Sequence, residues 1–301
     1  MDRVAVVYNA RSGVLLGRPD DSPAEQLTEL FGQRGVAAEV RAFDPQTFAT
    51  DLRELLAGEP DALIVVGGDG TIRSIAERML GSDVPLGVLP AGTMNVLARD
   101  LGMPGDLDSA VRALLNAPVD RIDVATVNGL PFLCSSTLAM MPHLGRLRES
   151  ARGGLGLDAL RLLGRALRLV WRYPRMRLTI VVDGQEHRVR TRAAVVSCNP
   201  LASGPPPMPG RQRLDAGTLG VYVARDRTNW DLAVVAAKLF DGSWQRDERI
   251  LRFEGKTVQV RSSRLALMSV MSDGEIAQLA MPLDYEIRPR ALAVLAPGAA
   301  T

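Results

Sequence analysis

One short turn in the first third of the chain carries residue types that bind phosphate. Residues 67–71 place three glycines around Asp69, directly after a run of buried-type apolar residues. Glycines let the backbone approach a ligand closely, and the N–H groups of a following helix favour an anion. A carboxylate would repel phosphate, so Asp69 is expected to act through Mg²⁺ or a bound water. The alternative is an ordinary strand-to-helix turn with a capping aspartate.

A second turn places two carboxylates close together. Asp273 and Glu275 flank Gly274 between two strand-like runs. Taken alone, Asp-Gly-Glu is more typical of a plain hairpin turn.

The elements around residues 67–71 alternate between strand and helix. Thr71 is expected to cap a helix that begins at Ile72. This alternation predicts a doubly wound, mostly parallel sheet with helices on both faces. Ligands bind beyond the carboxyl ends of such strands. Strands are expected over residues 3–8, 37–43, 61–66 and 85–89, so the polar turns at 9–13, 67–71 and 90–95 should meet at one edge.

The pattern changes after Val119 to closely spaced strand-like runs. Asn128-Gly129, Asp183-Gly184 and Asp273-Gly274 are strong hairpin signals. This half predicts an antiparallel β-sandwich or barrel with a few helices. We therefore expect an α/β domain over residues 1–120 and a β domain over 121–301.

Composition excludes several classes of function. The formal charge of +2 is too small to indicate nucleic-acid binding. No apolar run approaches the ~18 residues of a membrane-spanning helix, and no cleavable leader is evident, so a cytoplasmic protein is expected. Cys134 and Cys198 match no metal or redox spacing. With two histidines in the chain, a histidine-rich metal site is not expected.

Four arginines share one face of a predicted helix over residues 157–172. The favoured interpretation is a solvated stripe on a helix that packs against the β domain. The alternative is an amphipathic helix that rests on anionic lipid, with Trp171 at the level of the headgroups. The stripe consists of Arg161, Arg165, Arg168 and Arg172.

Taken together, these motifs resemble a known family. Gly-Gly-Asp-Gly-Thr at 67–71, followed by Pro-Leu-Gly-Val-Leu-Pro-Ala-Gly-Thr-Met-Asn at 85–95, resembles the diacylglycerol kinase catalytic domain of bacterial lipid kinases, sphingosine kinases and ceramide kinases. The resemblance continues through residues 9–13, 214–217 and 272–275. It implies a nucleotide-binding α/β domain, a following β-sandwich, and an active site in the cleft between them.

The resemblance also implies roles for individual residues. Asp69 would handle the catalytic Mg²⁺ and Glu275 would accept the proton of a lipid hydroxyl. Asp273 would orient a metal-bound water or raise the pKa of Glu275, and which of the two carboxylates is the base stays open. The residues expected to bind ATP are Asn9, Gly67, Gly68, Asp69, Gly70, Thr71, Ile72, Arg73, Gly92 and Thr93.

Some positions depart from the family pattern. Ala10 replaces a proline, Arg73-Ser74 replaces Asn-Glu, and Val96 follows Asn95. Ala216 stands where the family has an aspartate beside a structural metal, so Asp215 is the remaining candidate ligand there.

Three functions remain open at this stage. The leading hypothesis is an ATP- and Mg-dependent kinase for diacylglycerol or a sphingoid-like lipid, acting at the inner face of the membrane. A homodimer stays an option. The alternatives are a NAD kinase, which shares the first turn, and a catalytically weak lipid-binding homologue.

Overall fold

The structure is a computed structural model that describes the chain except residues 11–21, 151–163, 166–167, 203–208, 227 and 299–301. The chain divides into two compact units, Met1–Ile122 together with Arg290–Thr301, and Asp123–Pro289. The return of the C-terminal segment to the first unit was not predicted. Among the described helices, none is long and apolar enough to cross a membrane.

The first unit is built on a parallel sheet, as predicted. The strand order is β2-β1-β3-β4, and the end of β16 (Leu283–Leu295) adds a parallel pairing through Val294 and Leu86. Every residue of β3 is buried, because its apolar run is covered on both faces. The other strands are β1 (Arg3–Tyr8), β2 (Ala37–Ala42), β3 (Ala62–Gly67) and β4 (Leu86–Pro90).

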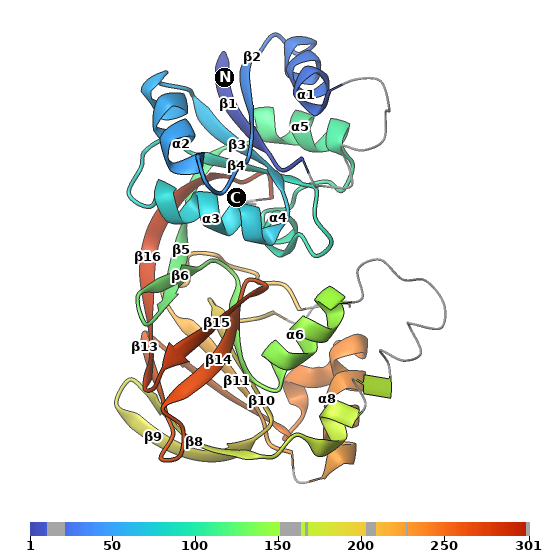
Figure 1. Cartoon of the computed structure of the whole chain (residues 1–301), viewed down its shortest axis with the longest axis vertical. Helices are drawn as coiled ribbons and strands as arrows, with labels where there is room; N and C mark the ends of the chain where they lie inside the picture. Colours follow the sequence, from blue (N-terminus) through green and yellow to red (C-terminus); the bar gives the residue numbers. More distant parts are fainter. Residues whose placement is uncertain (11–21, 151–163, 166–167, 203–208, 227, 299–301) are drawn as a thin grey trace. The chain divides into compact units, whose positions relative to one another are not determined.

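Helices cover both faces of this sheet, with α1 and α5 on one side and α2 and α3 on the other (Figure 1). Each presents an apolar stripe inward, as Leu27 and Phe31 do in α1. Ser22 and Glu25 form a capping box at the start of α1. The helices are α1 (Pro23–Gly32), α2 (Phe48–Ala57), α3 (Asp69–Met79), α4 (Val96–Asp100) and α5 (Leu107–Leu115).

The predicted cap at Thr71 is wrong. Helix α3 begins three residues earlier than predicted, at Asp69, and the extended backbone of Gly68 is its N-cap. Thr71 lies buried in the first turn of α3, where its hydroxyl accepts a hydrogen bond from the side-chain amide of Asn9. The glycines allow the chain to enter the helix before the threonine is reached.

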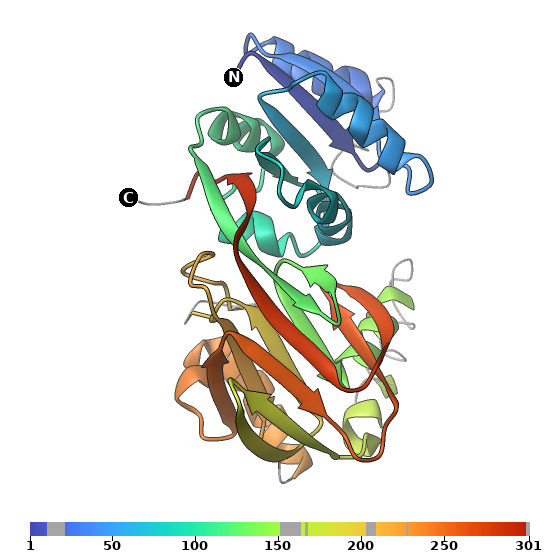
Figure 2. The same ribbon diagram turned by 90° about the vertical axis from the view of Figure 1, so that its left-hand side faces the viewer.

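The second unit is an antiparallel β-sandwich, as predicted (Figure 2). One layer contains β5 (Val119–Val127), β6 (Leu130–Phe132), β8 (Met176–Val182), β9 (Gln185–Thr191), β13 (Thr257–Arg261) and most of β16. The other has the order β12-β11-β10-β7-β14-β15, with bounds Ile250–Gly255, Leu219–Ala224, Ala193–Cys198, Ser135–Ala139, Leu267–Ser272 and Glu275–Ala280. Residues from both layers, such as Phe132, Ile180 and Val221, form one core.

All three predicted hairpins are confirmed, and the strand-like run that follows Asp183-Gly184 forms two strands. β9 belongs to one layer and β10 to the other, and the chain changes layers at Arg192. Thr191 turns the corner by donating its hydroxyl to the Ala193 carbonyl at 2.8 Å. Hydropathy continues across the corner, so the sequence pattern does not reveal it.

The described helices of this unit include one that the sequence analysis missed. The missed helix is α8 (Asn229–Asp241), which the 3₁₀ turn Ser243–Arg246 follows. A further described helix is α6 (Met141–Ser150). A capping box formed by Thr228 and Asp231 was the available signal. Of the predicted helix over 157–172, the structure describes residues 164–165 and 168–172, which are helical.

Candidate active site

In the first unit, Asn9 ties the end of β1 to the first turn of α3. Its backbone N–H donates to the Val66 carbonyl, and its side-chain amide donates to the Thr71 hydroxyl at 2.9 Å. Both residues were expected at the nucleotide site. The structure brings them together because β1 and β3 are parallel neighbours whose carboxyl ends coincide. Residues 11–13 of the same predicted motif lie outside the described residues.

Asp69 links the first polar turn to the second. One of its carboxylate oxygens accepts the backbone N–H of Val96 at 2.8 Å. The side chain of Asn95 closes the second turn, accepting the Gly92 N–H at 2.8 Å and donating to the Gly92 carbonyl at 2.9 Å. Asn95, which stands in the left-handed region at φ 47°, was not among the predicted site residues. Asparagine tolerates that conformation well, and this was the signal available in the sequence.

The two turns meet through their glycines. A Cβ atom on Gly92 would lie 2.5 Å from the Cα atom of Gly68, closer than any side chain tolerates. The backbones can therefore approach each other only because both residues lack a side chain. The start of α3 has no side-chain cap, because its N-cap residue is Gly68. Backbone N–H groups at such a helix start suit a phosphate.

The other residues predicted to bind the nucleotide differ in whether their side chains and N–H groups can contact a ligand. Thr93 is exposed and Arg73 is half-buried, so both side chains can reach a ligand. Ile72 is fully buried in the core, and its N–H is bonded to the Gly68 carbonyl at 3.1 Å. Its side chain and N–H are therefore committed to the fold, and we do not extend the candidate site to Ile72.

In the second unit, Asp273 faces into the protein from the hairpin turn. Its carboxylate accepts three consecutive backbone N–H groups, from Leu133 at 2.6 Å and from Cys134 and Ser135 at 2.9 Å each. Burial raises the pKa of Asp273, while these three donors and the nearby Arg211 act in the opposite direction. This geometry makes Asp273 the residue that holds the hairpin against the 133–135 loop.

Glu275 is exposed at the start of β15, paired in register with Ser272. The hairpin thus fixes the backbone of Glu275, while its carboxylate stays accessible. Of the two carboxylates, Glu275 is the one that a substrate can reach directly.

Asp215 lies beside a guanidinium. Its two oxygens are 3.1 and 3.3 Å from Arg213 Nε and Nη2. Within the described part of the chain, no group of three or more histidine, cysteine, aspartate or glutamate side chains is placed to hold a metal. A metal at Asp215 would have to compete with Arg213, and its metal role stays a prediction.

Two buried charged residues of the second unit were not predicted from the sequence. Asp123 is 1% exposed and accepts the Asn199 amide at 2.6 Å and the Gly217 N–H at 2.7 Å. Arg211 donates to the Leu133 and Cys198 carbonyls at 2.5 and 2.9 Å. Arg211 and Asp273 therefore both bind the 133–135 loop. Neither residue belongs to a recognisable motif.

Family models match both parts of the chain. Residues 3–127 match the model described as the diacylglycerol kinase catalytic domain. Residues 150–296 match the model described as the YegS C-terminal NAD kinase beta sandwich-like domain.

Individual relatives cover most of the chain. A diacylglycerol kinase of Mycobacterium tuberculosis is 27% identical over 83% of this chain and 82% of its own length. An uncharacterized protein of Synechocystis is 24% identical over 80% of this chain, which spans 56% of that protein. A crystal structure of a putative diacylglycerol kinase from Bacillus anthracis shares the fold, with a TM-score of 0.75 at 19% identity over 100% of this chain and 98% of that one.

The sandwich, the paired glycine turns and these matches agree with one another. The chain belongs to the diacylglycerol kinase-like family of bacterial lipid kinases.

Proposed function

We propose that the protein transfers the γ-phosphoryl group of Mg-ATP to the hydroxyl of a lipid of the diacylglycerol or sphingoid type. The observation that supports this most is the start of α3, which lies at the contact between Gly68 and Gly92 and has no side-chain cap on its backbone N–H groups. Phosphoryl transfer is catalysed mainly by positioning and charge neutralisation, which such a backbone nest provides.

In this proposal the first unit holds the nucleotide. The N–H groups at the start of α3 and the side chains of Thr93 and Arg73 bind the phosphates. Asp69 has one carboxylate oxygen bonded to Val96, which leaves the other to face a metal-bound water. Magnesium typically keeps several waters and needs one or two protein carboxylates beside the phosphates, so a single aspartate fits. When bound, it neutralises the charge that develops on the phosphoryl oxygens.

The second unit provides the base. Glu275 accepts the proton of the lipid hydroxyl as the oxygen attacks phosphorus. Asp273 positions Glu275 by fixing the hairpin to the 133–135 loop. We propose that the soluble chain reaches its lipid at the inner membrane surface in the cytoplasm.

Incubation with labelled ATP and a panel of lipids and NAD, followed by separation of products, tests the function. A labelled lipid phosphate that disappears with chelator supports the proposal. Labelled NADP would instead identify a NAD kinase. If ATP is not consumed with any acceptor while lipids still bind, the protein is a lipid-binding homologue. The Asp69→Asn variant is the control for contaminating kinases.

A further inference from the structure

Three buried hydroxyl groups inside the sandwich form a line that ends beside Glu275. The Tyr285 Oη and Ser136 Oγ atoms are 3.2 Å apart, and Ser272 donates its hydroxyl proton to Ser136 Oγ at 3.1 Å. Tyr285, Ser136 and Ser272 are 1%, 0% and 7% exposed. We call these three residues the hydroxyl cluster. None of them binds the nucleotide or acts as the base in the proposed reaction.

Strand pairing places Ser136, Ser272 and Glu275 in one row across the sheet. Ser272 of β14 lies directly opposite Ser136 of β7 on one side and Glu275 of β15 on the other. Directly paired residues of antiparallel strands point to the same face, with Cβ atoms about 4.5–5.5 Å apart. The side chains of Ser272 and Glu275 are therefore neighbours, close enough for a hydrogen bond. Glu275 is exposed because β15 is the edge strand of this layer.

The turn between Ser272 and Glu275 fixes this pair. Asp273 and Gly274 have φ angles of 48° and 90°, and a type I′ turn requires positive values at both positions. The carboxylate of Asp273 is in addition bonded to three backbone N–H groups of residues 133–135. The backbone on both sides of the turn is therefore held, and the freedom that remains to Glu275 is in its side chain.

The inward-facing positions of two strands change from apolar residues to serine toward this turn. In β14, Met268 and Val270 belong to the hydrophobic core and are followed by Ser272. In β7, Leu138 belongs to the same core and is preceded by Ser136. The serines are thus confined to the end of the two strands that lies beside Glu275.

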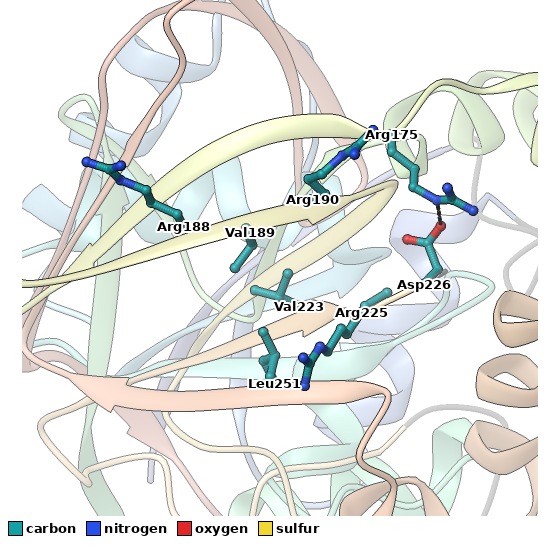
Figure 3. Close-up of a pocket in the computed structure, with 9 residues that line it drawn as sticks. Arg175, Arg188, Val189, Arg190, Val223, Arg225, Asp226 and Leu251 are labelled. Carbon is teal, nitrogen blue, oxygen red and sulfur yellow. Dashed lines mark hydrogen bonds and ion pairs between the residues drawn. The ribbon is translucent and has the colours of Figure 1, made fainter. Parts of the chain in front are cut away.

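An ion pair of the same unit serves a different purpose. Asp226 follows β11 and is bonded at 3.1 Å to Arg175, which precedes β8 in the other layer (Figure 3). That contact joins segments from different layers. Ser272 differs, because its partner Ser136 lies on β7, which is already paired with β14 through the backbone. Replacing both partners of such a bond by apolar groups can leave stability nearly unchanged, so stability does not explain the two serines.

The direction of the hydrogen bonds decides what Ser272 can do for Glu275. A hydroxyl has one proton, and Ser272 gives its proton to Ser136, so toward Glu275 it can only accept. A carboxylate has no proton to donate, whereas the carboxylic acid formed after proton transfer has one. Burial raises the pKa of Tyr285, which keeps the far end of the hydroxyl cluster protonated.

We propose that Ser272 is a positioning residue for phosphoryl transfer, which accepts a hydrogen bond from Glu275 as this carboxyl takes up the proton of the lipid hydroxyl. In that step the hydroxyl oxygen bonds to phosphorus, the bond from phosphorus to the leaving oxygen of ADP breaks, and the proton passes to Glu275. Ser136 and Tyr285 hold Ser272 in the accepting orientation. The inference rests on the proposed function, because it takes Glu275 as the base.

Ser272→Ala tests this role. The variant should lower kcat about two- to tenfold, as expected for one lost hydrogen bond, and leave KM for ATP and for the lipid unchanged. Ser272→Thr keeps the hydroxyl and should restore most of the turnover. The matched control is Ser269→Ala on the same strand, because Ser269 is paired with Gln278 and points to the opposite face. This control should keep wild-type kcat.

A double-mutant cycle shows whether Ser272 acts through Glu275. Glu275→Gln alone should lower turnover strongly, and adding Ser272→Ala should then have no further effect. A merely structural serine would lower turnover by the same factor in both backgrounds, and that result would overturn the inference. So would wild-type kcat of Ser272→Ala, or wild-type turnover of Glu275→Gln.

The same assays separate this inference from the proposed function. If the wild-type protein phosphorylates a lipid and Ser272→Ala does so equally well, only the positioning role is wrong. If the wild-type protein phosphorylates no lipid of the panel, the proposed function is wrong, and the positioning role is wrong with it.

Discussion

A carboxylate oxygen of Asp69 accepts the backbone N–H of Val96 at 2.8 Å. This bond joins the starts of helices α3 and α4, which follow neighbouring parallel strands. Asp69 thus has a structural task in addition to the metal contact that we propose for it. The two tasks can be separated by substitution.

Asp69→Asn should lower kcat by about 10²–10³ while leaving stability close to wild type, because asparagine keeps an acceptor for Val96 but loses the charge. Asp69→Ala should lose both activity and some thermal stability. Turnover on lipid and the thermal midpoint of each variant check this. Near wild-type turnover of Asp69→Asn would remove the proposed metal role.

Gly92→Ala should separate the two turns, because the added Cβ would meet the Cα atom of Gly68 at 2.5 Å. We expect a loss of ATP affinity and about 1–3 kcal/mol of unfolding free energy. Gly105→Ala is the matched control, since nothing lies within 4 Å of its Cβ position. Titration with ATP and urea unfolding measure both effects. Unchanged ATP affinity of Gly92→Ala would show that the close approach is not needed for binding.

Glu275→Gln and Asp273→Asn should impair different properties, the first kcat and the second stability. Glu275 is exposed, so its replacement should reduce kcat strongly without altering stability or ATP affinity. Asp273→Asn keeps an acceptor for Cys134 and Ser135 but turns a donor toward the Leu133 N–H, costing about 1–3 kcal/mol. Kinetics and urea unfolding of both variants distinguish them. If Asp273→Asn abolishes turnover while remaining fully stable, Asp273 is the base.

Asp226→Asn should destabilise the second unit by about 3–5 kcal/mol, because it leaves the Arg192 guanidinium buried without its counter-charge. The two side chains are 1% and 2% exposed. Asp83→Asn is the control, since the carboxylate of Asp83 is 96% exposed in its pair with Arg121 and such pairs contribute about 1 kcal/mol or less. Similar unfolding free energies for the two variants would contradict a structural role for the buried pair.

Stability should fall in alkali partly through Cys198. Burial raises the pKa of this thiol from its ordinary 9.0 to about 12. The unfolded chain then loses the proton first, so stability decreases as pH rises from 9.0 to about 12, by about 1.4 kcal/mol per pH unit. Cys198→Ala should show a shallower decline than wild type in urea unfolding at several pH values. Identical pH dependence would mean that the thiol ionises equally in both states.

Local patterns determined much of this protein. The alternation of strands and helices predicted the doubly wound sheet, and the Asn-Gly and Asp-Gly pairs predicted three hairpins of the sandwich. The glycines of residues 67–71 and Gly92 marked the two turns that meet beside the start of α3. These features depend on neighbours within a few residues, where backbone conformation and apolar period are encoded directly.

Only the tertiary structure decided which partners meet across long separations. Asp273 binds N–H groups about 140 residues earlier in the chain, and Arg192 holds Val170, Asp226 and Asn229 around one guanidinium. The change of layer at Arg192 follows from that packing. Hydropathy assigns a buried arginine to the surface, because its burial depends on a distant carboxylate that no local pattern identifies.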